Sequence, residues 1–189
     1  MRFLDVLLGR TKPVKSKLDR LFAISTAYLT LTVDIGLSST ERAAICFRPL
    51  SSTQFSAMRQ ELDGLLRIGE QTSGTTAQVL QDDYGFTWVV LEDPQFEDLV
   101  TTIHMVSLTL DDAGFGTQLL AAVFKFTQNG QPVFWIYNYK RGSFYPFVPL
   151  GGRKEHDSAT ELRLRAVMEK ELPIEHDLER WYPLWGAPL

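Results

Sequence analysis

Two short stretches of this 189-residue chain carry residue types that bind metal ions, a Glu-His-Asp triplet at 155–157 and another at 175–177. Imidazole nitrogens and carboxylate oxygens are common ligands of divalent metals. Adjacent side chains on one chain rarely point at the same ion, and both triplets fall in loops or at expected helix ends, where such residues are usually solvated. We therefore expect no metal site, and the sequence indicates no other cofactor.

A nucleophile or an acid/base pair is not apparent in the sequence either. Cys46 lies in the apolar run 43–47, which favours a buried, unreactive thiol over a catalytic one. The acid pairs at 82–83 and 111–112 stand at an expected turn and an expected helix end, without a positioned partner. The sequence has no GxSxG or HExxH motif, and the Gly-Phe-Gly at 114–116 follows a helix instead of opening one. We predict no catalytic residue and favour a protein that is not an enzyme.

The most distinctive stretch is the aromatic run 133–150, VFWIYNYKRGSFYPFVPL, whose formal charges are Lys140 and Arg141. Gly142 readily takes a positive φ, so the run predicts a β-hairpin with a cationic turn and aromatic strands. Because such cations suit phosphates, carboxylates or an acidic partner, we predict that Lys140 and Arg141 contact a partner or an anion. Interleaved aromatics also suit single-stranded nucleic acid, but a net charge of −4 argues against that partner.

A second hypothesis is a small-ligand-binding domain, or an unrecognised enzyme, with an aromatic pocket. Its candidate lining is Trp88, Trp135, Tyr137, Tyr139 and His104. Aromatic residues in strands belong more often to the core than to a pocket. A histidine at the edge of an apolar helical stripe is usually satisfied by a neighbour. The burial of these rings decides between the two interpretations.

Residues 1–15 are expected to form a short amphipathic segment that precedes the domain. Its apolar and basic side chains could contact anionic lipid headgroups, and the candidates are Phe3, Leu4, Leu7, Leu8, Arg10 and Lys12. At under three helical turns the segment would bind lipid weakly by itself, so a terminal helix docked on the domain is the alternative.

Residues 16–189 are expected to form a single domain, because the chain is long enough for one well-packed core and short for two. Its apolar runs fall short of the roughly 20 residues that a membrane span needs. The first residues lack the pattern of a cleavable signal peptide, and the single Cys46 fits a reducing compartment. We therefore expect a cytoplasmic protein, at the inner face of the membrane if the first segment contacts lipid.

The hydrophobic periodicity predicts an α+β fold, in which helices pack on a largely antiparallel sheet built from strand-strand-helix units. Helices are expected at 16–24, 51–68, 93–113 and 158–171, and strands at 26–33, 42–47, 77–82, 86–91, 117–127, 133–139 and 143–148. Asn129 and Gly130 form the strongest turn signal, and Pro146 and Pro149 predict that the last strand is an edge strand or ends early.

The ends of the expected helices carry capping signals. Ser51 with Gln54, and Ser158 with Glu161, have the spacing of a capping box, and Asp93 is a good N-cap for the third helix. The tail at 180–189 contains two Trp and two Pro, and its exposure to water would be costly. We expect it to pack back on the domain, with presentation to a partner as the alternative.

Several segments together resemble the PspAB family, the phage-shock-protein-A-associated proteins of actinobacteria and some archaea. The matching segments are DDYGFTW at 82–88, AGFG at 113–116 with QLL at 118–120, YKRGSFYPF at 139–147, and WYPLWGAP at 181–188. FLD at 3–5, LGR at 8–10 and KPV at 12–14 fit as well. Ser143 and Tyr182 are conservative departures, where Thr and Phe would be expected.

This resemblance implies an accessory protein of a phage-shock-like envelope-stress response. The implied partner is a PspA-like coiled-coil protein that binds membranes. The resemblance brings no catalytic residues, in agreement with the motif search. The sequence therefore favours a non-enzymatic adaptor over the small-ligand alternative.

Overall fold

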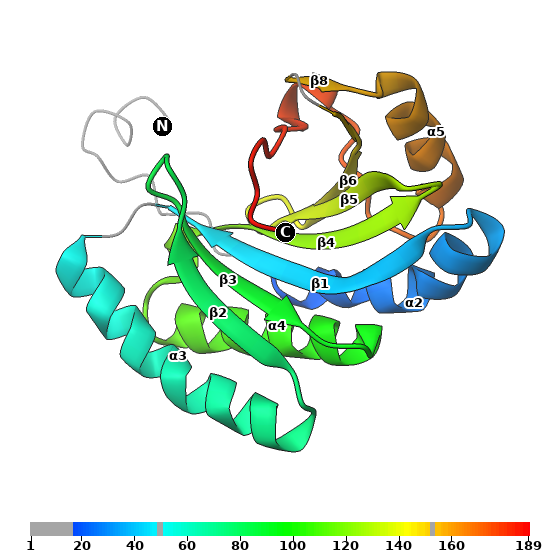
Figure 1. Ribbon diagram of the computed structural model, residues 1–189. Helices are drawn as coiled ribbons and strands as arrows, with labels where there is room; N and C mark the ends of the chain where they lie inside the picture. The colour runs from blue at the N-terminus through cyan, green and yellow to red at the C-terminus, as the bar shows by residue number, and fades with distance from the viewer. Residues whose placement is uncertain (1–16, 49–50, 152–153) are drawn as a thin grey trace, which may run out of the picture.

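The computed structural model describes residues 17–48, 51–151 and 154–189, and its centre is a six-stranded antiparallel sheet (Figure 1). The strands lie in the order β2-β3-β1-β4-β5-β6. Their bounds are β1 Ser38–Phe47, β2 Thr76–Gln81, β3 Thr87–Glu92, β4 Leu119–Gln128, β5 Gln131–Asn138 and β6 Ser143–Phe147. A short separate pair follows, β7 Pro149–Leu150 with β8 Glu155–His156. The predicted α+β class with an antiparallel sheet is confirmed.

Three helices lie on one face of the sheet, and a fourth packs beside its β6 edge (Figure 1). The three are α2 Ala23–Leu29, α3 Ser52–Thr72 and α4 Phe96–Asp112, and the fourth is α5 Ser158–Met168. Short helical turns are η1 Asp19–Phe22, η2 Thr30–Asp34, η3 Gly116–Gln118 and η4 Leu178–Arg180. We call the opposite face of the sheet the C-terminal face, because the last residues of the chain cross it.

The strand predicted at 26–33 is wrong, because this segment is helical through α2 and η2. In this segment Tyr and Thr alternate with Leu and Val, and this alternation has the two-residue period that is typical of a β-strand. The side chains that are buried, Ile24, Ala27 and Leu31, instead follow the period of a helix, while Leu29 and Val33 are exposed. Packing against α4 and the sheet therefore decides the structure, and it overrides a β propensity that is weak and dependent on context.

The helix starts follow the sequence signals in part. Ser51 and Gln54 form the predicted capping box at the start of α3. The predicted cap of α4 is wrong: Gln95 is the N-cap residue, whereas Asp93 is buried and accepts hydrogen bonds from the Thr75 hydroxyl (2.5 Å) and the Gln95 N–H (2.7 Å). An acidic side chain two residues before the cap thus links the loop before β2 to the start of α4.

The capping box predicted at the start of α5 is also wrong. Asp157 is the N-cap residue and accepts from the Thr160 N–H at 3.0 Å. Glu161 is buried instead, and it accepts from the Val148 N–H and lies 2.8 Å from Nδ1 of His156. The carboxylate therefore ties α5 to the segment that follows β6.

The sheet separates two hydrophobic cores, as expected when side chains alternate between its faces. The larger core packs against α2, α3 and α4, and includes Trp135, Tyr137 and Tyr139. The smaller core lies on the C-terminal face, and its sheet residues are Ala44, Cys46, Trp88, Val90, Ala121, Val123, Phe134, Ile136, Tyr145 and Phe147. The tail packs on it through Trp181, Leu184, Trp185, Ala187 and Leu189.

The aromatic hairpin has the predicted form. β5 and β6 pair in antiparallel register, with Trp135 opposite Pro146, and Gly142 in the connecting turn has φ +67°. β6 is an edge strand of the sheet, as Pro146 predicted. A later segment covers this edge, because the Phe144 N–H donates to the Pro173 carbonyl and the Glu175 N–H donates to the Phe144 carbonyl, both at 2.8 Å.

Candidate functional site

A cleft of about 760 Å³ opens on the C-terminal face, at the end of the sheet where the turn between β5 and β6 lies. Its floor follows one row across the sheet, in which Trp88 pairs with Cys46, Cys46 with Ala121, and Ala121 with Asn138. Directly opposite residues of neighbouring strands share a face, so these side chains lie in line. The small side chains of Cys46 and Ala121, between larger neighbours, leave the hollow.

One wall of the cleft is the turn between β2 and β3, which contributes Tyr84 and Phe86. The carboxylate of Asp82 holds this turn. It accepts from the backbone N–H groups of Tyr84 and Phe86 and from the indole N–H of Trp88, each at 2.9 Å. Gly85 supplies the positive φ that the turn needs, +80°. Asp82 therefore fixes both the wall and the indole at the floor.

Replacing Asp82 with Ala is expected to destabilise the protein by about 2 kcal/mol, because a charged acceptor of three hydrogen bonds is lost and donors beside the cleft are left unpaired. The freed Trp88 indole should also change its fluorescence. Denaturant unfolding followed by tryptophan emission checks both effects. Asp83→Ala is the matched control, since Asp83 is exposed at the next position of the same turn. Equal unfolding midpoints for the two variants would contradict the role given to Asp82.

The second wall is the C-terminal segment. The Trp181 ring stacks on Tyr145 at a centroid distance of 6.0 Å, and its indole N–H donates to the Glu175 carbonyl at 2.9 Å. The Tyr145 hydroxyl donates to the Tyr182 carbonyl at 3.0 Å, and Trp185 meets Phe147 edge-on at 4.9 Å. These contacts place residues 182–185 opposite the β2–β3 turn, so both walls of the cleft have defined positions.

The rim of the cleft is strongly basic. Among the described residues, five basic side chains and one acidic side chain, that of Asp82, line it; the five are Arg48, Lys140, Arg141, Lys154 and Arg180. The whole chain has a net charge of −4, so this local excess of positive charge opposes the overall balance. Positive potential concentrated in a cleft attracts anions.

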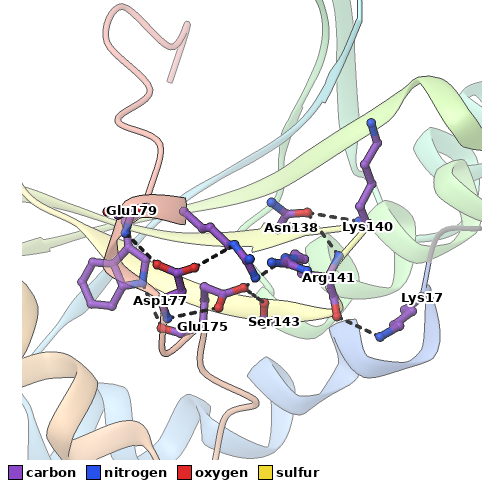
Figure 2. A network of polar contacts seen from close by, with 10 residues as sticks. Lys17, Asn138, Lys140, Arg141, Ser143, Glu175, Asp177 and Glu179 are labelled. Carbon is purple, nitrogen blue, oxygen red and sulfur yellow. Dashed lines mark hydrogen bonds and ion pairs between the residues drawn. The ribbon is translucent and has the colours of Figure 1, made fainter. Parts of the chain in front are cut away.

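Two of the five cations are paired with acids of the segment that precedes η4 (Figure 2). Nε of Arg141 lies 3.5 Å from Glu175, and Nε of Arg180 lies 2.9 Å from Asp177. Within the described part of the chain, Arg48, Lys140 and Lys154 form no ion pair. Three cations are therefore available to an anion in the cleft.

Lys140 is held by its backbone while its ammonium group is free of the acidic network. Its N–H donates to Oδ1 of Asn138 at 3.1 Å, and Figure 2 shows its side chain extending away from Glu175 and Asp177. Partial burial lowers the pKa of Lys140, and the nearby charge of Arg48 lowers it further. An anion in the cleft would relieve this repulsion between like charges.

The thiol on the floor is not a nucleophile at neutral pH. Burial raises the pKa of Cys46 to about 12, and the negative charge of Asp82 contributes in the same direction. The rate of thiol modification in the native protein should therefore keep rising with pH beyond 10, whereas an ordinary thiol reaches its plateau above its pKa of about 8.5.

The raised pKa of Cys46 also affects the stability of the folded protein at high pH. An unfolded thiol ionises near pH 8.5 and the folded one does not, so the stabilisation is fully present below that pH and is lost as pH rises towards 12. Modification rates measured against pH, with the denatured protein as control, check the shift. A plateau near pH 9 in the native protein would contradict it.

The five aromatic and histidine side chains proposed from the sequence to line a pocket are not brought together. Trp88 lies on the floor of the cleft. Trp135, Tyr137 and Tyr139 are fully buried in the core on the opposite face of the sheet, where the Tyr137 and Tyr139 rings meet edge-on at 5.4 Å. His104, on α4, contacts the Phe22 ring at 4.5 Å. Alternation along β5 sends Trp135 and Tyr137 to the helix-covered face.

Lys140 and Arg141, in contrast, lie together on the cleft rim. No sequence pattern pointed to Arg48, Lys154 and Arg180, which are isolated cations that separate parts of the chain bring to the cleft. Tyr84 and Tyr182 are exposed on the two walls of the cleft. In the sequence they are distinguished only by lying in aromatic segments. Long-range strand pairing therefore assembles most of the cleft.

The two Glu-His-Asp triplets are separate local networks in the structure. His156 pairs with Glu161, His176 lies 3.4 Å from Glu169, and Asp157 and Asp177 cap α5 and η4. Across residues 17–48, 51–151 and 154–189, no three His, Cys, Asp or Glu side chains are grouped so as to hold a metal ion.

The proposed lipid contacts Phe3, Leu4, Leu7, Leu8, Arg10 and Lys12 lie outside the described residues. Among the helices that the structure does describe, none is both long and apolar enough to cross a membrane.

Fold and site together define an α+β domain with a basic, aromatic cleft on the sheet face opposite its main helices. The chain belongs to the PspAB family, PspA associated protein B, whose family model matches residues 1–189. The resemblance noted in separate sequence segments is thus confirmed over the full chain. Neither the curated proteins nor the solved structures gave a match.

Proposed function

We propose that this protein is a non-enzymatic adaptor of a phage-shock-like envelope-stress response, acting with a PspA-like, membrane-binding coiled-coil protein. The observation that carries the proposal is the full-length match to a family named for its association with PspA. In this proposal the protein works in the cytoplasm, at the inner face of the membrane where its partner acts.

The chemistry of the cleft supports binding more than catalysis. The thiol of Cys46 is protonated at neutral pH, the carboxylate of Asp82 already accepts three hydrogen bonds, and the hydroxyl of Tyr145 donates to a backbone carbonyl. These interactions commit the lining groups to the fold, and the described lining holds no histidine and no free carboxylate that could act as a general base. A surface of this kind recognises charge and shape.

The partner contact in this proposal is the cleft rim. Tyr84 and Tyr182 are 64% and 57% exposed, and Lys140 lines the same cleft. Exposed tyrosines beside basic residues are typical of protein interfaces, where aromatic rings supply contact area and cations select an acidic partner. An acidic surface of the PspA-like protein would complement this rim.

Affinity capture from cells at native expression level tests the proposal. The tagged protein, shown to complement a deletion strain under envelope stress, should recover a PspA-like protein reproducibly. Capture with a tagged, unrelated protein of similar charge is the control. Repeated failure to recover a PspA-like protein with a complementing tagged chain would overturn the proposal.

A further inference from the structure

The cleft also has the features of a small-molecule site, independently of any protein partner. Its volume of about 760 Å³ lies within the range of about 300 to 1,000 Å³ that is common for such sites. Its floor and walls are mostly apolar, and the basic side chains gather at the rim. This division points to a ligand with one charged end and one apolar end.

The charged end must be an anion. Arg48 follows β1, Lys140 lies in the turn after β5, and Lys154 precedes β8, so three separate parts of the chain bring unpaired cations to one cleft. Of the three, Arg48 and Lys140 are close enough to repel one another, and an anion between them would relieve that repulsion. A guanidinium beside an ammonium group suits a dianion with several acceptor oxygens, which is the chemistry of a phosphate monoester.

The apolar floor of the cleft indicates what the other end of the ligand must be. Trp88, Cys46 and Ala121 are at most 7% exposed and present indole, thiol and methyl groups along one row. The acceptor atoms nearby are occupied, because Asp82 accepts three hydrogen bonds and Oδ1 of Asn138 accepts from the N–H groups of Lys140 and Arg141. A nucleobase would need free acceptors on the floor for its own N–H groups, whereas a hydrocarbon chain needs none.

We propose that the cleft binds a single-chain alkyl or acyl phosphate, with its phosphate between Arg48 and Lys140 and its chain along the row from Trp88 to Ala121. The Tyr84–Phe86 wall and the segment 183–185 enclose the chain from its two sides. This ligand class goes beyond the adaptor function, and its test does not involve the protein partner.

Calorimetric titration of the full chain with decyl phosphate, below its micelle concentration, tests the proposal. One molecule should bind per chain. Inorganic phosphate, adenosine monophosphate and decyltrimethylammonium should each bind at least about tenfold more weakly, since each lacks either the apolar chain or the negative head. Equal or tighter binding of adenosine monophosphate would overturn the proposal in favour of a nucleotide site.

Three variants locate the ligand. Lys140→Glu should weaken decyl phosphate binding by about tenfold or more, because it removes a cation that contacts the phosphate. Ala121→Leu should weaken binding to a similar extent, because the larger side chain fills the hollow that holds the hydrocarbon chain. Lys170→Glu is the matched control, because Lys170 is an exposed cation after α5, away from the cleft lining. If Ala121→Leu does not fold, Lys140→Glu, at a half-exposed position of the turn, still decides. Unchanged affinity in Lys140→Glu, or no binding by the folded wild type, would overturn the proposal.

Discussion

Removing residues 181–189 is expected to make the folded protein unstable and prone to aggregation. Trp181, Leu184 and Trp185 pack on the C-terminal face, against Tyr145 and Phe147 among others. These side chains are partly buried, so each contributes less than the roughly 1.5 to 3 kcal/mol of full burial. The truncation also exposes Tyr145 and Phe147, and the combined loss is about 5 kcal/mol. Domains of this kind are stable by only about 5 to 15 kcal/mol in total.

The truncated protein should therefore unfold at least about 10 °C below the full chain and lose much of its soluble yield. The measurement is thermal unfolding by circular dichroism together with the soluble fraction after expression. Tyr182→Ala is the control, since the Tyr182 side chain lies in the same segment but is 57% exposed and should unfold close to the wild type. A truncated chain as stable as the full one would mean that the tail is not part of the fold.

The double variant Lys140→Ala and Arg141→Ala is expected to keep its fold and to bind the PspA-like partner at least about tenfold more weakly. Stability changes little, because the Arg141 pair with Glu175 involves a half-exposed guanidinium and Lys140 forms no ion pair in the described part of the chain. Partner binding weakens because two cations leave the rim, and charge complementarity governs both encounter and specificity. Binding of the purified proteins at several salt concentrations is the measurement.

A control must remove the same charge elsewhere. Arg67→Ala with Lys170→Ala does so at two exposed positions, on α3 and after α5, outside the cleft lining. The control should bind like the wild type and show the same salt dependence. If both double variants bind equally well, the hairpin turn is a structural feature and not a contact.

The sequence predicted the elements whose signals are local. The capping box at Ser51 and Gln54 depends on residues three apart, and the turn at Gly142 depends on one residue that tolerates a positive φ. The edge position of β6 followed from the missing N–H of Pro146. Such signals operate within a few residues, so a single sequence carries them in full.

The errors arose where distant packing outweighs local preference. Residues 26–33 alternate like a strand, yet Ile24, Ala27 and Leu31 are the side chains that reach the core. Asp93 and Glu161 had the spacing of helix caps, but each is drawn inward by partners on another element, Thr75 and Val148. A buried carboxylate with distant donors is satisfied better than one exposed at a helix start.

The cleft could be predicted only in fragments. Lys140 and Arg141 were identified as contacts because they interrupt an aromatic run, and Trp88 was identified for its ring. Arg48 reaches the same rim through the pairing of β1 with β4, whose partners lie more than seventy residues apart in the chain. No local pattern marks such a residue, because its role depends on the order of strands in the sheet.

The cleft rim is the surface proposed to meet the PspA-like partner, and site-specific photo-crosslinking tests this proposal most directly. A photoreactive phenylalanine derivative is placed either at Tyr84, on the cleft wall, or at Met105, which is 43% exposed on α4. In cells under envelope stress, the probe at position 84 should crosslink to the PspA-like protein and the probe at position 105 should not. Crosslinking from position 105 alone would place the interface on the helices and contradict the account.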